Sequence, residues 1–248
     1  SGIMNLAAAS GEDLALVSDI VTDALTAFGL SASDSARFAD VLAAASSNAN
    51  TNVAMMGETF KYVAPVAGSL GYSAEDNAVT IGLMGNAGIK ASQAGTSLRQ
   101  ILLGLQGGVE LATKSTDSWV IEVENADGSM RNLNDVVVDL REAFADMTDA
   151  QKASNAEAIA GKVGMSGLLA IVNASEGDFN KLTEAINNSN GVAKNMAETM
   201  QDNLNGKLTQ LKSALEGVAI SFGEVLIPML MKVIESITNV VQKFANLD

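Results

Sequence analysis

The sequence predicts a mostly α-helical protein: a compact domain of short helices, one small β-hairpin and a long C-terminal amphipathic helix. The chain has 248 residues, of which 48% are hydrophobic but only 4% aromatic, so its core must be built mainly from Ala, Leu, Val, Ile and Met. Such a composition favours closely packed helices over a sheet rich in aromatic and β-branched residues. There are only two prolines. Apolar residues also recur at helical spacing along most of the chain.

Glycines and capping residues divide the first 106 residues into short helices. Ser10 and Asp13 have the spacing of a capping box, and Gly29 closes the helix that follows. Pro65 is expected to kink or end the third helix. Ser73 and Asp76 have capping-box spacing before the fourth helix. The predicted helices cover 12–28, a stretch that begins after residue 33, 51–65, 74–88 and 92–106, and the last is stopped by Gly107 and Gly108.

Residues 118–133 depart from the helical pattern. Trp119, Ile121 and Val123 occupy alternate positions, and Asp127-Gly128 is a turn signal, so this segment is predicted to be a β-hairpin. The tryptophan is expected to bury its ring against the helices, with surface recognition as the alternative. Further helices are predicted at 134–147, 149–160, 165–173 and 178–187, the second after a Thr148/Gln151 capping box and the last capped by Ser175. The segment 160–172 resembles 87–102 faintly, which leaves an internal repeat open.

The last fifty residues carry an apolar stripe with the 4-3-4-3 spacing of a coiled-coil seam. A helix with such a stripe lies along other helices or pairs with another copy. Charged residues interrupt it, so no uncharged apolar run approaches the roughly 20 residues that span a bilayer; an interfacial amphipathic helix remains the alternative. The seam consists of Leu204, Leu208, Leu211, Leu215, Val218, Phe222 and Val225. The expected division of the chain is 1–117, 118–133, 134–190 and 191–248.

Composition argues against most enzyme classes and against nucleic-acid binding. The net charge is −14 without a basic cluster, so direct binding to nucleic acid is not expected. With no histidine and no cysteine, Ser-His-Asp and Cys-His centres and the Cys/His zinc sites are excluded. Carboxylate pairs such as Glu75/Asp76 and Glu122/Glu124 could serve a glycosidase, but the first pair is better explained as helix N-terminal acids. We predict no enzyme activity, no catalytic residue, no cofactor and no metal.

The run from Asn86 to Leu105, NAGIKASQAGTSLRQILLGL, is the most informative in the chain. A left-handed C-cap after an apolar helix needs a glycine, and Gly88 stands there. Ser92 is the candidate N-cap of a second helix, whose first turn is made of small residues that allow a close approach to another helix. Basic residues in this run are expected to pair with nearby acids or to contact a partner. The residues predicted to matter, all for structural reasons, are Gly88, Lys90, Gly95, Thr96 and Arg99.

This run resembles the tail tape measure proteins of long-tailed bacteriophages and prophages. Three other stretches fit the same pattern, and the resemblance is strongest between residues 38 and 105. The family's turn usually reads Gly-Ile-Lys-Gly-Ser, and Ala91 stands in place of the second glycine, which leaves a left-handed backbone at position 91 open. The other stretches are SGIMNLAAASGEDL (1–14), FADVLAAASSNANTNVAMMGETFKYVAPVAGSLGYSAED (38–76) and LTQLKSALEGVAISFGEVLIPML (208–230).

The resemblance implies a structural virion protein that sets tail length, scaffolds assembly of the tail tube and takes part in DNA ejection. It implies a place in the lumen of the tail tube, after assembly in the host cytoplasm. The implied partners are the tail tube protein, tail assembly chaperones and, at infection, the host membrane. The chain begins inside a helical pattern, so we expect it to be a segment of a longer protein that self-associates through its C-terminal helix. The alternative function is a membrane-active module that helps DNA cross the host envelope.

Overall fold

The computed structural model describes residues 1–111, 119–203, 207–208, 211, 228, 231–236 and 239. These residues are mostly helical, with one small antiparallel sheet, which confirms the predicted fold class. Residues Ser1–Glu198 form one compact unit, and Thr199–Asp248 form a second. The expected segments 1–117, 118–133 and 134–190 all lie within the first unit, which contains one continuous apolar core.

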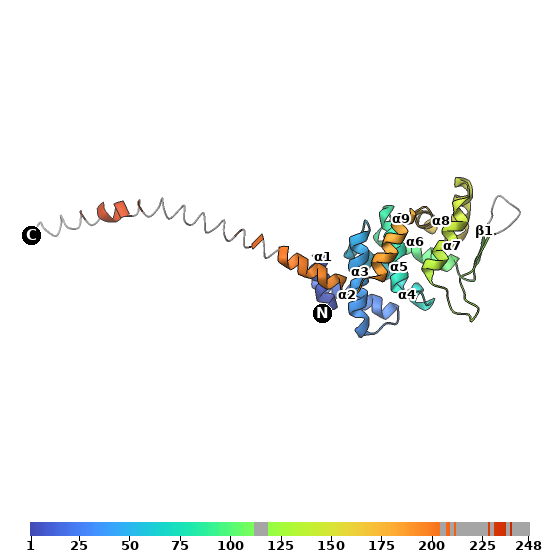
Figure 1. Ribbon diagram of the computed structural model, residues 1–248, viewed down its shortest axis with the longest axis horizontal. Coiled ribbons are helices and arrows are strands. Elements are labelled where there is room, and N and C mark those ends of the chain that lie inside the picture. Colours follow the sequence, from blue (N-terminus) through green and yellow to red (C-terminus); the bar gives the residue numbers. More distant parts are fainter. Residues whose placement is uncertain are drawn as a thin grey trace, which may run out of the picture. The chain divides into compact units, whose positions relative to one another are not determined.

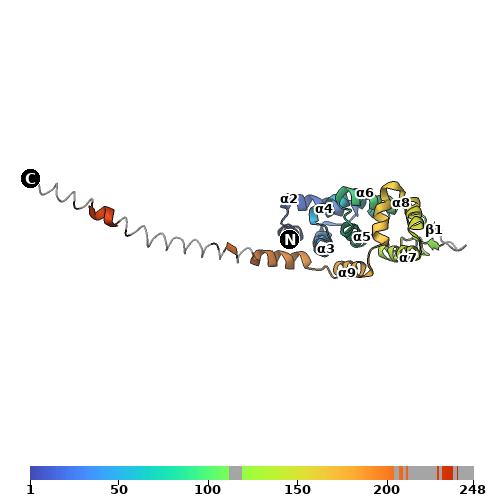
Figure 2. The ribbon, with the colours of Figure 1, turned by 90° about the horizontal axis from the view of Figure 1, so that it is seen from above.

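The first six α-helices of this unit lie in two rows (Figures 1 and 2). One row holds α2, α4 and α6, each packed on the next, and the other holds α1, α3 and α5. Beyond them, α8 packs on α6, and α9 packs on both α3 and α5. The bounds are α1 Gly2–Ser10, α2 Leu14–Ala27, a 3-10 helix at Ala32–Asp34, α3 Ser35–Asn48, α4 Val53–Ser69, α5 Ala74–Asn86, α6 Ala91–Gly104, α7 Leu133–Ala145, α8 Asp149–Val172 and α9 Glu176–Asn187.

These six helices are three copies of one helix pair. The helices α2, α4 and α6 begin at Leu14, Val53 and Ala91, spacings of 39 and 38 residues, and α3 and α5 begin 39 residues apart. All five residues that α2 buries have buried counterparts in α4 and α6 at this spacing. Repeats of this length that stack helix pairs are typical of α-solenoids. The equivalent positions are Val17/Met56/Ala94, Ile20/Thr59/Ser97, Val21/Phe60/Leu98, Ala24/Val63/Ile101 and Leu25/Ala64/Leu102.

Several helix ends agree with the sequence predictions. Gly29 is left-handed, and the N–H groups of Gly29 and Leu30 bond to the carbonyls of Thr26 and Leu25, which is a Schellman motif. Thr148 and Gln151 form the predicted capping box, and Ser175 caps α9. Gly161 (φ 63°, ψ 178°) breaks α8 between the two helices predicted there.

The predicted capping box before the first helix is wrong in one respect. Ser10 is the last residue of a separate helix, α1, and its hydroxyl donates to the carbonyl of Leu6. Asp13 itself caps α2, because its carboxylate accepts the N–H groups of Ala15 and Leu16. Pro65 lies inside α4, which continues to Ser69.

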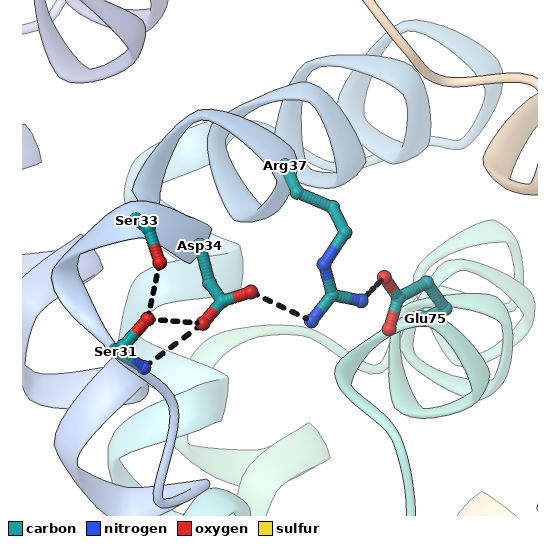
Figure 3. Close-up of polar contacts among 5 residues, drawn as sticks. All are labelled: Ser31, Ser33, Asp34, Arg37 and Glu75. Atoms are coloured by element: carbon teal, nitrogen blue, oxygen red, sulfur yellow. Dashed lines mark hydrogen bonds and ion pairs between the residues drawn. The ribbon is translucent and has the colours of Figure 1, made fainter.

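An ion-pair network ties the start of α3 to the next helix in its row (Figure 3). The Asp34 carboxylate accepts hydrogen bonds from the N–H and the hydroxyl of Ser31, at 2.9 and 2.8 Å, and these bonds lower the pKa of Asp34. Arg37 lies between Asp34, at 3.7 Å, and Glu75 at the start of α5. The side chain of Arg37 is half exposed, so we assign this network to alignment of the two helices more than to stability.

The β-hairpin differs from the prediction in its pairing. Strand β2 (Trp119–Ile121) pairs with the upstream strand β1 (Val109–Leu111), not with the residues after the turn. Gly107 and Gly108 both have positive φ and turn the chain into β1, where the sequence indicated only the end of a helix. The predicted turn at Asp127-Gly128 does form, with a single bridge between Glu124 and Met130. Residue 118 lies outside the described residues.

Trp119 does not anchor the hairpin. Its side chain is 42% exposed, whereas Leu111, Ile121 and Val123 are buried. By alternation Trp119 shares the face of Ile121, but burial along this face begins only at Ile121. The aliphatic residues therefore attach the hairpin to the core, and the expectation of a buried tryptophan is wrong.

A buried carboxylate joins α5 to α7. Asp76 is 6% exposed and accepts a hydrogen bond from Asn134 Nδ2 at 2.8 Å and one from the Leu133 backbone. Asp76 N–H donates to the hydroxyl of Ser73, which confirms Ser73 as the N-cap of α5. Burial raises the pKa of Asp76 above its ordinary value, and hydrogen bonds to its carboxylate from the Ser73 side chain and the Leu133 backbone act in the opposite direction.

This raised pKa makes a prediction about pH. A proton binds more tightly to Asp76 in the folded state, so the contribution of this group to stability is largest when it is protonated and is lost as the pH rises through its folded pKa. We therefore compare the free energy of unfolding of Asp76→Asn with that of the unmodified chain. The variant's value minus that of the unmodified chain is expected to be more positive at pH 7 than at pH 3. Urea unfolding of both proteins at the two pH values measures this, and a difference that is constant or shrinks towards pH 7 would contradict it.

The seam of the C-terminal helix is only partly within the described residues. Leu208 and Leu211 are helical, and their side chains are 53% and 56% exposed. Leu204, Leu215, Val218, Phe222 and Val225 lie outside the described residues. In the described part of the chain, no single helix has the length and apolar character to cross a bilayer; only α8 and α9 together do, with a 90° bend between them.

Candidate structural site at helix α6

The turn between α5 and α6 is built by two left-handed residues. Gly88 has φ 85°, and the N–H groups of Gly88 and Ile89 bond to the carbonyls of Gly85 and Met84, at 3.0 and 2.9 Å. This is the C-cap predicted for Gly88, in its Schellman form. Ala91 has φ 52° and is the one non-glycine residue with positive φ in the described part of the chain. The position where the tape measure pattern has its second glycine is therefore left-handed here too, although it holds alanine.

Helix α6 begins at Ala91, so Ser92 is not its N-cap. Lys90 occupies the capping position in an extended conformation, and its side chain does not cap the helix. Instead the Thr59 hydroxyl of α4 lies 3.0 Å from the carbonyl of Ala91 and 2.9 Å from that of Met55. This buried threonine holds the left-handed turn against α4.

Small residues on one side of α6 let it approach α4. A Cβ atom at Gly95 would lie 2.6 Å from the carbonyl oxygen of Thr59 and 2.7 Å from the Cβ of Tyr62. Real Cβ atoms do not tolerate such distances, so only glycine fits. At the equivalent position one repeat earlier, a Cβ atom at Gly57 of α4 would lie 2.4 Å from side-chain atoms of Ile20 in α2. This repeated close approach sets the spacing of the row.

The other side of α6 approaches α8 in the same way. A Cβ atom at Gly104 would overlap the carbonyl oxygen of Ile159, and one at Gly167 would lie 2.7 Å from the Cβ of Ser97. The Ser97 hydroxyl donates to the carbonyl of Val163 at 3.2 Å. Helix α6 is therefore packed through small residues on both sides. The sequence indicated the side that contains Gly95 but not the side that faces α8.

Within the described residues, neither basic residue of the motif forms an ion pair with an acid. Lys90 Nζ donates to Asn50 Oδ1 at 2.9 Å, and the N–H of Asn50 donates to Asn86 Oδ1 at 2.8 Å. Lys90 thus joins this turn to the turn before α4. Arg99 is exposed and makes no ion pair within the described residues. Thr96 is half-buried one position after Gly95.

The strained alanine gives a prediction at this site. An L-residue in the left-handed region costs about 1–2 kcal/mol, partly offset because glycine loses more entropy on folding. Ala91→Gly is expected to raise the free energy of unfolding by about 0.5–1 kcal/mol. Urea denaturation measures the change. Ala158→Gly, at an exposed and ordinary helical position of α8, is the control and should lower the free energy by about 1 kcal/mol. Equal losses in both variants would contradict the strain at Ala91.

In the described residues, no group of three or more carboxylates could hold a metal ion. Of the carboxylate pair singled out in the sequence, Glu75 binds Arg37 and Asp76 is bonded to α7. Both acids therefore have structural roles.

The fold and this site define a helical packing module whose distinctive residues are small and set helix spacing. A family model described as "Phage-related minor tail protein" matches residues 1–161, and the chain belongs to that family.

Two curated relatives match almost the whole chain. It is 40% identical over 246 residues to the "Tape measure protein" of Pneumococcus phage Dp-1, covering 99% of this chain and 21% of that protein. It is 27% identical over 243 residues to the "Probable tape measure protein" of Escherichia phage P2, covering 97% of this chain and 30% of that protein. The resemblance to tape measure proteins is thus confirmed, while the chain spans less than a third of either relative. No solved structure matches.

Proposed function

We propose that this chain is a folded segment of a tape measure protein, a structural component of the phage tail. The observation that carries the proposal is the 40% identity over 99% of the chain to the tape measure protein of phage Dp-1. In this proposal the parent protein sets tail length, scaffolds tail tube assembly with the tube protein and assembly chaperones, lies in the tube lumen and acts in DNA ejection. It is assembled in the host cytoplasm and has no enzyme activity.

We infer from the helical stack that this segment is not the ruler, that is, the part of the parent protein whose length sets the length of the tail. An extended α-helix rises about 1.5 Å per residue, which would give a length proportional to the number of residues. The described part of residues 2–187 instead contains nine α-helices packed in one unit with a continuous core. We infer that the segment acts as a folded unit in assembly and that length is measured elsewhere in the parent chain.

Electron microscopy of phage whose parent gene lacks the codons for 1–198 tests this function. We expect absent tails or tails of unregulated length, because a folded assembly unit is missing. Tails shortened by about 1.5 Å for each deleted residue would mean that the segment is stretched as a ruler in the virion. Normal tails on fully infectious phage would overturn the structural role.

We also propose that the C-terminal helix self-associates. Leu208 and Leu211 lie three residues apart, as seam positions do, and both are more than half exposed. Light scattering of the purified chain should give a mass above that of the monomer, and Leu208→Lys with Leu211→Lys should shift it to the monomer. A monomeric unmodified chain would contradict this.

A membrane-active module is the second candidate function. The observation that favours it is the set of exposed apolar residues in the second unit, Leu208, Leu211, Met231, Val233 and Ile234. Dye leakage from liposomes, compared between the chain and a version ending at residue 206, tests it. Equal leakage from the two would remove this candidate, and loss of leakage on truncation would support it.

A further inference from the structure

A buried acid of α3 contacts the start of the helix at residues 192–203. Asp40 is 8% exposed, and its Oδ2 and Oδ1 accept the N–H groups of Gly191 and Ala193, at 2.8 and 2.9 Å. The contact joins parts of the chain about 150 residues apart in sequence. A carboxylate this deeply buried is rare in proteins unless donors satisfy it.

The helix stack itself does not require an acid at this position. In the repeat, Asp40 of α3 corresponds to Val79 of α5, since both stand five residues after the first residue of their helix. Val79 is 1% exposed in the core. An aliphatic residue therefore fits the equivalent place between the rows. The contact with residues 191–193 explains why this position holds an acid and not an aliphatic residue.

That contact is a helix cap supplied by another helix. Gly191 precedes the helix and has φ 80°, and its carbonyl accepts the N–H of Asn195, the first bond of the new helix. The residue at the N-cap normally supplies a side-chain oxygen to the first free N–H groups. Glycine has no side chain, and the Asp40 carboxylate takes this role. A negative charge there is also favoured by the helix dipole.

Further contacts hold the first turns of this helix to α3. Ala193 and Ala197, one turn apart, are buried. The Ser47 hydroxyl of α3 donates to the Met196 sulfur at 3.2 Å. Residues up to Glu198 belong to the first compact unit.

We propose that Asp40 is the anchor that fixes the start of the C-terminal helix onto α3. Without it, the first turns of this helix would be held to the stack only by the apolar contacts of Ala193 and Ala197, the Ser47–Met196 contact and the loop after α9. With it, the start of the helix is also fixed directly to α3 through the Asp40 carboxylate. This anchor does not rest on the proposed function.

Hydrogen exchange of the purified chain tests the anchor. Asp40→Val places the residue of the equivalent repeat position at the site, so the stack is expected to remain folded. Amides of 191–198 should exchange about tenfold to a hundredfold faster, as expected for the loss of hydrogen bonds to a charged acceptor. Amides of α5 and α6 should be unchanged.

Two outcomes would overturn the proposal: unchanged protection of 191–198, or a loss of protection equally large in α5 and α6. Asp40→Asn is the second variant. It keeps the shape and one acceptor oxygen, so its effect should lie between those of the unmodified chain and Asp40→Val. Because these measurements use only the purified chain, their failure is distinguishable from failure of the tail function, which the deletion in phage tests.

Discussion

Replacing Gly95 by leucine is expected to lower the free energy of unfolding of the helical stack by about 3 kcal/mol, the upper part of the usual range for overpacking. Even the first added atom would lie 2.6 Å from the Thr59 carbonyl oxygen and 2.7 Å from the Tyr62 Cβ. Neither atom is the flexible end of a side chain, so α4 and α6 would have to separate. Urea denaturation, followed by the loss of helical circular dichroism, measures the effect.

Gly177→Leu is the matched control for this change. Gly177 lies in the first turn of α9, is exposed, and has only the Ser175 hydroxyl oxygen near a built Cβ, at 3.9 Å. It should leave stability unchanged or raise it by up to about 1 kcal/mol, because leucine forms helices better than glycine. Unchanged stability of Gly95→Leu, or equal losses in the two variants, would show that the close approach of α4 and α6 is not needed.

Phe60→Ala is expected to cost about 3–5 kcal/mol, as is usual when a buried phenylalanine is truncated. Phe60 is 2% exposed and makes edge-to-face contacts with Phe38 and Phe28, with ring centroids 5.3 and 5.9 Å apart. These rings join α4 to α3 and to the end of α2, so the cavity would lie between two helix pairs. Urea denaturation with an unchanged m-value would show that stability alone is affected.

Phe60→Leu provides the comparison for that cavity. Leucine is the residue at the equivalent position of the next repeat, Leu98, and it should retain most of the buried volume. Its cost is expected to be less than half that of Phe60→Ala. If both variants lose the same stability, the specific aromatic contacts matter more than the filled volume, contrary to the cavity argument.

Features with a local cause were predictable from the sequence. The left-handed glycines at 29 and 88 and the caps at Ser73, Thr148 and Ser175 depend on a few neighbouring residues, and they were predicted correctly. The mostly helical fold followed from composition and apolar spacing. In the candidate site, Gly88 and the small residue Gly95 were found for the same reason.

Features that depend on distant residues were not predictable in this way. The partner of β2, the exposure of Trp119 and the acceptor for Lys90 are set by tertiary contacts. The repeat of helix pairs was also missed, and the suggested match of 160–172 with 87–102 is not the one that the structure contains. Equivalent positions share burial but not identity, as Ile20, Thr59 and Ser97 illustrate, so comparison of residue types does not find them.

The stacking of helix pairs has a consequence for the order in which the unit comes apart. In a one-dimensional stack, each pair is stabilised chiefly by its neighbours, so an end pair opens before an inner one. The pair α1/α2 packs against α3 and α4, whereas α5 and α6 are enclosed between α3 and α4 on one side and α8 and α9 on the other. When this chain is unfolded by itself, unravelling should therefore start from the α1/α2 pair and advance one helix pair at a time, in steps of 38 or 39 residues, so that a folded body is converted gradually into a thread.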